Sequence, residues 1–234
     1  MNVLIIAAHP DDEILGMGGT IAKHTSQHDN VTIIYMSTGI TARRKPAEYE
    51  IKSIPKKIQE KWQQEIEELQ QDAKKSAKLL KVKNVKFFDF PDNEMDGIHL
   101  LKVVKVIEKE IESVKPDVIY TNHYSDLNVD HKVVYNATLA ACRPSSFPVN
   151  EIISFEVLSS TEWSYPYNFN PNYFINIDKH LEKKIKAMEL FTSEIRKFPH
   201  PRSSENIKHV ASRWGTVSGF KAAEAFEIIR RFNK

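Results

Sequence analysis

The stretch VLIIAAHPDDE, residues 3–13, decides the fold of this chain. Its first six residues form a continuous apolar run, which is typical of a parallel strand that is buried on both faces. One imidazole and three carboxylates follow directly, on His9, Asp11, Asp12 and Glu13. Charged groups at the end of a buried strand cost free energy to desolvate unless a partner compensates them. The stretch therefore predicts a strand that delivers polar side chains to a functional site.

Strand patterns and helix patterns alternate along the rest of the chain, which favours a parallel sheet with crossover helices. We expect strands at residues 3–8, 31–36, 85–90, 117–121 and 151–158, with a sixth candidate at 173–177. We expect helices at residues 13–25, 58–80, 98–114, 130–142, 178–196 and 203–232, the last with a break near 215–219. Since no linker is evident, residues 1–234 are expected to form one α/β domain. The predicted fold is a Rossmann-like three-layer sandwich, with helices on both faces of a mostly parallel central sheet.

The composition excludes several classes of protein. With 234 residues, 41% of them hydrophobic, the chain can build one cored domain. The 33 basic and 31 acidic side chains nearly balance, so bulk charge gives no case for a nucleic-acid partner. A single cysteine, Cys142, excludes a disulfide framework and a thiolate zinc cluster. No apolar stretch approaches the roughly 20 residues that span a bilayer, and no secretory signal pattern opens the sequence, so we expect a cytoplasmic protein with no membrane span.

Polar clusters follow three of the predicted strands at their carboxyl ends, where open parallel α/β sheets bind ligands. They comprise His9, Asp11, Asp12 and Glu13 after the first strand, Asp92 and Asp96 after the third, and His123, Asp126, Asp130 and His131 after the fourth. Taken alone, the first cluster could be a capped helix start, and a single histidine is more often a surface residue than a ligand. Together, a His/Asp/His set fits a catalytic zinc site with an open position for water. A carboxylate nearby that does not bind the metal can take a proton from that water.

The same residues resemble a known family. The stretch His9-Pro10-Asp11-Asp12-Glu13, followed downstream by Asp126-Leu127-Asn128-Val129-Asp130-His131, is similar to the zinc-dependent N-deacetylases of the LmbE/PIG-L family. Members include the mycothiol- and bacillithiol-pathway deacetylases and the GPI-pathway GlcNAc-phosphatidylinositol deacetylase. The resemblance covers most of the chain, because the stretches at residues 90–93, 201–203 and 223–226 also look like family members.

The resemblance implies one zinc ion per chain, with His9, Asp12 and His131 as its ligands. Asp11 matches the general base of the family, whereas Glu13 is expected to open the following helix. The remaining implied roles are Asp130 and Asp126 as partners that orient imidazoles, Asp92 as a contact for substrate hydroxyls, and Arg43 or Arg44 as a substrate contact. Two points stay open. Either arginine can make that contact, or both can be solvated loop charges, and His/Asp/His sets also hold iron or cobalt.

One motif departs from the family pattern. Many relatives read His-Pro-Asp-His where this chain reads Asn128-Val129-Asp130-His131, and the first histidine of that motif helps to stabilise the oxyanion. Asn128 can still donate a hydrogen bond, but it cannot be a cation or a general acid. His123 could supply the missing imidazole from nearby, so both residues are candidates for a catalytic role beside Asp11. Protonated Asp11 is the first choice for the acid that protonates the leaving amine.

The leading hypothesis is removal of the N-acetyl group from an amino sugar or its conjugate, with release of acetate. A nucleotide-linked sugar is the favoured version, because Arg43, Arg44 and Arg202 and the mildly basic pI of about 8.4 would suit a phosphate. For Arg202 a simple capped turn is an equal alternative. The other hypotheses are hydrolysis of another small-molecule amide and a non-catalytic sugar-binding module on the same scaffold. Oligomers are common in the family, so the expected partners are the small-molecule substrate and, as an open point, further copies of the chain.

Overall fold

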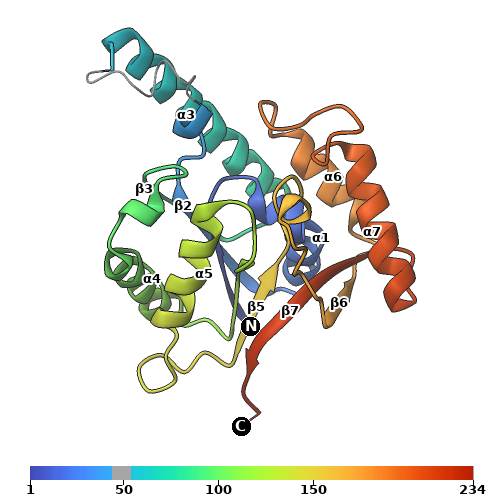
Figure 1. Ribbon diagram of the computed structural model, residues 1–234. Helices are drawn as coiled ribbons and strands as arrows, with labels where there is room; N and C mark the ends of the chain where they lie inside the picture. Colours follow the sequence, from blue (N-terminus) through green and yellow to red (C-terminus); the bar gives the residue numbers. More distant parts are fainter. Residues whose placement is uncertain (44–53, 234) are drawn as a thin grey trace.

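The computed structural model describes residues 1–43 and 54–233 of the chain. Its centre is a seven-stranded sheet with the strand order β3-β2-β1-β4-β5-β7-β6 (Figure 1). The strands are β1 (Asn2–Ala7), β2 (Asn30–Ser37), β3 (Asn84–Phe90), β4 (Val118–Asn122), β5 (Glu151–Phe155), β6 (Tyr173–Asn176) and β7 (Ala223–Arg231). The first five strands of the chain pair in parallel, whereas β7 is antiparallel to both β5 and β6. The sheet is therefore mostly parallel, as predicted.

Helices surround this sheet (Figure 1). They are α1 (Asp12–Ser26), α3 (Lys56–Leu79), α4 (Leu100–Val114), α5 (Val129–Ala141), α6 (Leu181–Glu189) and α7 (Ser204–Ser218). Short 3-10 turns occur at η1 (Thr41–Arg43), η2 (Met95–Gly97) and η3 (Thr161–Trp163). Within the two described ranges, none of the helices has both the length and the apolar character that crossing a membrane requires.

The residues of β1 explain why two helical layers form. Successive side chains of a strand point to opposite faces of the sheet, and in β1 both sets are apolar. Val3, Ile5 and Ala7 pack in one core with residues of α1, α3, α6 and α7. Leu4 and Ile6 pack in a second core with residues of α4 and α5. The predicted α/β sandwich with helices on both faces is thus confirmed.

The prediction of a helix over residues 203–232 is wrong in its second half. Helix α7 ends at Ser218, and the following Gly219 has a φ of 77°, a left-handed conformation that glycine adopts at little cost. The chain then enters β7, whose first four residues are buried and which pairs with strands on both sides. Burial between two neighbouring strands, and not the periodicity of a helix, explains the apolar residues of this segment.

Two further elements are shorter than predicted, and both differences shape the site. Strand β5 ends at Phe155 instead of residue 158, and α6 spans Leu181–Glu189 instead of 178–196. The segments that follow them, residues 156–160 and 190–203, are irregular and contribute side chains to the cavity described below. The sixth candidate strand is confirmed as β6.

Candidate active site

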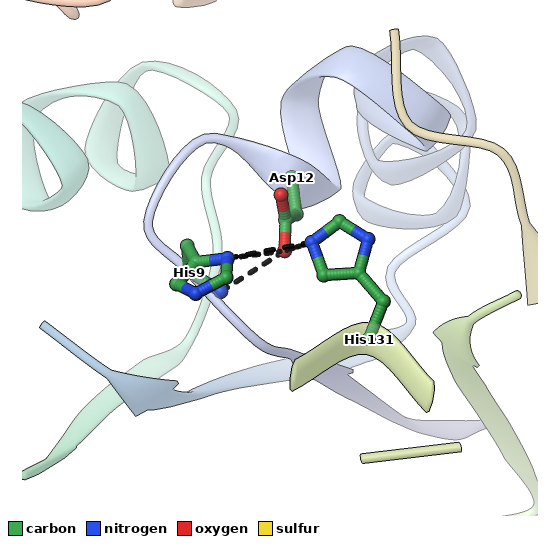
Figure 2. A group of neighbouring side chains, drawn as sticks. All are labelled: His9, Asp12 and His131. Atoms are coloured by element: carbon green, nitrogen blue, oxygen red, sulfur yellow. Dashed lines mark hydrogen bonds and ion pairs between the residues drawn. The ribbon is translucent and has the colours of Figure 1, made fainter. Parts of the chain in front are cut away.

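Three segments bring polar side chains to the carboxyl edge of the parallel strands. His9 follows β1, Asp12 opens α1, and His131 lies in the first turn of α5 (Figure 2). All three side chains are buried. Because β1 and β4 are parallel neighbours, their carboxyl ends meet at one edge of the sheet. The structure therefore brings together the three residues that the sequence analysis selects as metal ligands.

Asn122, the last residue of β4, joins these segments. Its side-chain oxygen accepts a hydrogen bond from the backbone N–H of Ala8 at 2.9 Å, and its amide donates to Asp12 Oδ2 at 3.1 Å. The backbone N–H of His9 donates to the same oxygen at 2.9 Å. These bonds fix the Asp12 carboxylate in a buried position. Asn122 is not among the residues predicted from the sequence, although a polar residue that ends a buried strand is an available signal.

Each of the three candidate ligands contributes one atom to a small triangle (Figure 2). His131 Nε2 lies 3.2 Å from Asp12 Oδ2 and 3.3 Å from His9 Nδ1, and His9 Nδ1 lies 3.6 Å from Asp12 Oδ2. In a tetrahedral zinc site with bonds of about 2.0–2.1 Å, neighbouring ligand atoms lie about 3.3–3.4 Å apart. The triangle therefore has the size of one face of such a site, and the three residues could hold a metal ion.

The outer partners of the two imidazoles assign their tautomers. His9 Nε2 lies 3.0 Å from Asp130 Oδ2, and His131 Nδ1 lies 3.0 Å from Asp126 Oδ2, so these nitrogens carry the protons in neutral rings. The lone pairs of His9 Nδ1 and His131 Nε2 then face each other and the Asp12 carboxylate. Three electron pairs that meet at one buried point repel one another unless a cation lies between them. The hydrogen bonding of this chain thus fits a bound metal ion.

Without a cation the same atoms attract protons. Burial would lower the pKa of His131, but the carboxylates of Asp12 and Asp126 raise it to about 9. Burial would also lower the pKa of His9, yet hydrogen bonds to three carboxylates raise it well above its ordinary value. Burial would raise the pKa of Asp12, but the charge on His131 holds it well below the usual range. Protons and a metal ion therefore compete for one site.

Asp11 stands beside the triangle in an unusual backbone conformation. Its φ of 113° is positive, which is uncommon for a residue other than glycine. Its carboxylate is buried, and its Oδ2 lies 2.9 Å from Arg202 Nη1. Burial raises the pKa of Asp11 to about 7, although the charge on Arg202 opposes the rise. A carboxyl group that titrates near neutral pH can both accept and release a proton.

Arg202 is held against Asp11 by two further partners. Its Nη1 lies 2.5 Å from Glu194 Oε2, and its Nε donates to Ser159 Oγ at 2.7 Å. The residue that caps α7 is Ser203, whose side chain accepts from the backbone N–H of Asn206. The guanidinium that the sequence analysis offered to a substrate phosphate is thus engaged with two acidic side chains. Glu194, an isolated acid in an irregular segment, carried no signal in the sequence.

A cavity of about 220 Å³ opens beside these side chains. Its lining includes the three candidate ligands together with Asp11, Asp92, Asn128, Glu194 and Arg202. Asp92 Oδ1 lies 3.2 Å from His9 Nε2, and its Oδ2 accepts from the backbone N–H of Ala42 at 2.8 Å. Asp92 therefore supports the candidate ligand His9 while its side chain still borders the cavity.

Asn128 caps α5 and also lines the cavity. Its Oδ1 accepts a hydrogen bond from the backbone N–H of Asp130 at 2.9 Å. Because the oxygen is engaged in this bond, the amide NH₂ is the group of Asn128 that a ligand could use. Asp126 is likewise fixed, because Thr161 Oγ1 donates to its Oδ2 at 2.7 Å and Ser160 Oγ donates to its Oδ1.

His123 takes a different place from the one expected. Its side chain is fully buried, its Nε2 lies 3.1 Å from Glu227 Oε2, and its ring packs edge-on against Phe169. It is absent from the described residues that line the cavity, so the structure does not bring His123 to the site. Arg43 ends η1, but its side chain and the whole of Arg44 lie outside the part of the chain that the structure describes.

Known proteins of similar sequence or fold include two deacetylases and one enzyme of a different kind. Diacetylchitobiose deacetylase from Thermococcus kodakarensis is 24% identical over an alignment that covers 97% of this chain and 83% of that protein. The crystal structure of a deacetylase from the biosynthesis pathway of teicoplanin matches with a TM-score of 0.77 and 15% identity over 100% of both chains. The 4-carboxy-2-hydroxymuconate hydratase from Pseudomonas putida matches with a TM-score of 0.70 and 18% identity, over 100% of this chain and 98% of that one. Chains with this fold thus carry out more than one reaction.

A match to a protein-family model shows which family the chain belongs to. That family model matches residues 4–142, which is more than half of the chain, and it is described as PIG-L, GlcNAc-PI de-N-acetylase. The matched residues run from β1 to the end of α5 and include all three candidate ligands as well as Asp11 and Asn128. The resemblance noted from the two sequence motifs is therefore confirmed, and the chain belongs to the PIG-L family.

Proposed function

We propose that this protein is a zinc-dependent N-deacetylase, which hydrolyses the amide of an N-acetyl amino sugar or its conjugate and releases acetate. The observation that carries the proposal is the triangle of His9 Nδ1, Asp12 Oδ2 and His131 Nε2 beside the buried Asp11. Membership of the PIG-L family supports the reaction class. Because a hydratase shares the fold, the proposed reaction rests on the side chains of the site and not on the fold.

The donor set favours zinc over harder cations. Imidazole nitrogen and carboxylate oxygen are ordinary zinc ligands, whereas magnesium and calcium prefer sites made of oxygen atoms. Three protein ligands leave one position open, as in catalytic zinc sites. A zinc ion there supplies a lowered pKa of water and polarisation of the amide carbonyl. Iron and cobalt suit the same donors, so metal analysis belongs to the test.

Asp11 is proposed to move the protons of the reaction. Its carboxylate borders the cavity and can take a proton from the attacking water. Water oxygen then bonds to the acetyl carbon, and cleavage of the C–N bond leaves an amine that needs a proton. The carboxyl group of Asp11 can return the proton it took, so one residue serves as base and then as acid. A pKa of about 7 suits both steps near neutral pH.

Asn128 is proposed to donate a hydrogen bond to the amide oxygen as negative charge develops on it. The cap to Asp130 holds the side chain at the cavity and leaves its NH₂ for this purpose. Preorganised donors of this kind change kcat by about 10²–10³ in enzymes that acylate or deacylate. We do not retain His123 for this role, because its ring is paired with Glu227 and packed against Phe169.

The cavity supports a substrate that is small at its reacting end. Its volume of about 220 Å³ lies below the range of about 300–1,000 Å³ that is common for ligand sites. An acetamido group and its sugar ring are of this order of size, and the name of the Thermococcus relative also points to an acetylated amino sugar. Asp92 and Arg43 or Arg44 remain proposed substrate contacts. Arg202 is not retained as one, because its charge is paired with Asp11 and Glu194 through Nη1.

The proposal is tested by mass spectrometry on zinc-loaded protein. The panel consists of N-acetylglucosamine, its N,N′-diacetyl disaccharide, UDP-N-acetylglucosamine and the malate glycoside of N-acetylglucosamine. Loss of one acetyl group from any of them, with acetate in equal amount, is the expected result. The matched control is Asp11→Asn, which keeps the size of the side chain and removes the base.

Three outcomes decide between the hypotheses. Turnover by the wild-type protein and not by Asp11→Asn supports both the reaction and the role of Asp11. Equal turnover by both would contradict the proposed base. No turnover of any sugar, by protein that holds one zinc ion per chain, would contradict the amino-sugar assignment and favour another amide or the binding-module hypothesis.

A further inference from the structure

We infer that Glu13 and Tyr35 are positioning residues, which hold the backbone of Asp11 in the conformation that places its carboxylate at the metal site. The inference rests on the proposed function for the role of Asp11. It goes beyond that function because neither Glu13 nor Tyr35 lines the cavity. Both side chains are fully buried behind the site.

Asp11 needs such support because its backbone conformation is strained. Its φ of 113° and ψ of −26° lie in a region that costs a non-glycine residue about 1–3 kcal/mol and persists only where the surroundings impose it. The carbonyl side of the residue is fixed by α1, because Ile14 and Leu15 donate to its oxygen at 3.0 and 2.9 Å. The N–H side requires a partner outside the helix backbone.

Glu13 is that partner. The backbone N–H of Asp11 donates to Glu13 Oε2 at 3.3 Å, and Tyr35 donates its hydroxyl proton to Glu13 Oε1 at 2.5 Å. An acidic residue that only favoured the start of α1 could remain exposed to water, where its interaction with the helix dipole costs no desolvation. Glu13 is instead fully buried, with one oxygen committed to Asp11 and the other to β2. The hydrogen bonds from Asp11 and Tyr35 explain why the Glu13 side chain is buried.

Tyr35 connects Glu13 to the rigid part of the molecule. It lies in β2, and its ring stacks on that of Phe87 in β3, with centroids 5.1 Å apart and planes 23° apart. The hydroxyl is therefore fixed by two paired strands. Asp11 is held at both ends, by Arg202 on its carboxylate and by the sheet, through Tyr35 and Glu13, on its amide. Loss of either anchor allows the carboxylate to leave its place at the cavity.

The test uses substitutions that separate the hydrogen bonds from the packing. Tyr35→Phe keeps the stacked ring and removes the donor to Glu13. Glu13→Gln keeps an acceptor for the Asp11 N–H and a polar group for the Tyr35 hydroxyl, whereas Glu13→Ala removes both. Tyr120→Phe is the matched control, because it removes another buried hydroxyl, one that lies 3.1 Å from His24 Nε2 and does not border the cavity.

Zinc content, kcat and KM are measured for each full-length variant on the substrate that the wild-type protein deacetylates. We expect kcat to fall about 10-fold in Tyr35→Phe and about 100-fold in Glu13→Ala, with KM and zinc content as in the wild type. Glu13→Gln and Tyr120→Phe are expected to keep most of the wild-type kcat. Wild-type kcat in Tyr35→Phe and Glu13→Ala would overturn the inference, as would equal losses in Glu13→Gln and Glu13→Ala. A loss of zinc that parallels the loss of kcat would also overturn it, because the pair would then support Asp12.

A crystal structure of zinc-loaded Glu13→Ala gives a readout that does not depend on activity. The expected change is a φ of Asp11 that has left the positive region, or a carboxylate that no longer borders the cavity beside Arg202. An unchanged Asp11 would overturn the inference. If the wild-type protein deacetylated nothing, the proposed function would fail while this measurement still tested the positioning. If Glu13→Ala did not fold, the structure and kinetics of Tyr35→Phe would decide in the same way.

Discussion

Arg202 and Asp11 form an ion pair at the edge of the candidate metal site, with Arg202 Nη1 2.9 Å from Asp11 Oδ2. The same nitrogen lies 2.5 Å from Glu194 Oε2, so one cation stands between two buried acids. Burial raises the pKa of Asp11 most, the charge on Arg202 lowers it, and the charge on Glu194 raises it again. Arg202 therefore lowers the pKa of the proposed base, so that more of it is ionised near neutral pH, and also holds its carboxylate in place.

Replacement of Arg202 by Gln is expected to move the acidic limb of the pH profile of kcat/KM to higher pH. The guanidinium is the main group that lowers the pKa of Asp11, so without it the pKa rises and less of the base is ionised at pH 7. We expect kcat/KM at pH 7 to fall about 10–100-fold and to recover in part at higher pH. Rates between pH 5.5 and 9.5 check this. An acidic limb in the wild-type position would show that Arg202 does not set the ionisation of Asp11.

Zinc binding to metal-free protein is expected to release protons. Zinc takes neutral imidazoles, whereas the acidic partners of the site raise the pKa of His131 to about 9 and that of His9 well above its ordinary value. At pH 7 the metal-free site therefore holds at least one proton that zinc must displace, so protons leave when zinc binds, and the affinity rises as the pH rises towards 9. Calorimetry in buffers of different ionisation enthalpy counts the protons. Release of less than about half a proton at pH 7 would contradict this ligand set.

The sequence predicts those residues of the site whose positions follow from a local pattern of apolar and polar residues. The apolar run of β1 ends just before His9, and α1 begins at Asp12, so the edge of the sheet and the first candidate ligands follow from neighbouring residues. His131 was reached in the same way, from the start of α5 after β4. In each case one strand or helix boundary decides where the side chain lies.

The parts of the site that the sequence does not predict depend on contacts between segments far apart in the chain, or on which of two neighbouring residues faces the site. Asn122 and His123 are adjacent, and successive residues at a strand end point to opposite sides. Asn122 therefore bonds to Asp12, whereas His123 lies against Phe169. The pairing of Arg202 with Asp11 joins residues far apart in the chain, which no local pattern encodes. Strand β7 was missed for the same reason, because its place between β5 and β6 is a tertiary property.

Asn128 offers a test of oxyanion stabilisation that leaves the fold intact. Asn128→Ser keeps a side-chain oxygen that can cap α5, since serine and asparagine are similarly good N-caps, and it removes the amide donor. We expect kcat to fall about 10²-fold while the melting temperature stays near that of the wild type. Asn128→Ala removes cap and donor together and is expected to lose about 1 kcal/mol of stability as well. Wild-type kcat in Asn128→Ser would remove Asn128 from the mechanism.

Glu156 makes the stability of the folded protein depend on pH. Its side chain is buried and accepts a hydrogen bond from Trp214 Nε1 at 2.5 Å. Burial raises its pKa to about 7, against the opposing effect of that bond, from an ordinary value of 4.5. Between these two pH values the folded state holds a proton that the unfolded state has lost. Stability therefore falls as the pH rises from 4.5 to 7, by about 3 kcal/mol in total for this residue alone, and stays constant above.

Glu156→Gln removes this titration while it keeps an oxygen that Trp214 can donate to. The free energies of unfolding in urea are compared for the wild type and this variant at pH 5 and pH 8. The variant is expected to gain about 2–3 kcal/mol relative to the wild type between these values, because only the wild type must bury a charge at pH 8. The exposed Glu112→Gln serves as the control and should show no such gain. Parallel stability curves for the wild type and Glu156→Gln would mean that Glu156 is ionised in the folded protein throughout, with its charge compensated by Lys184 and Arg213, the two cations that lower its pKa.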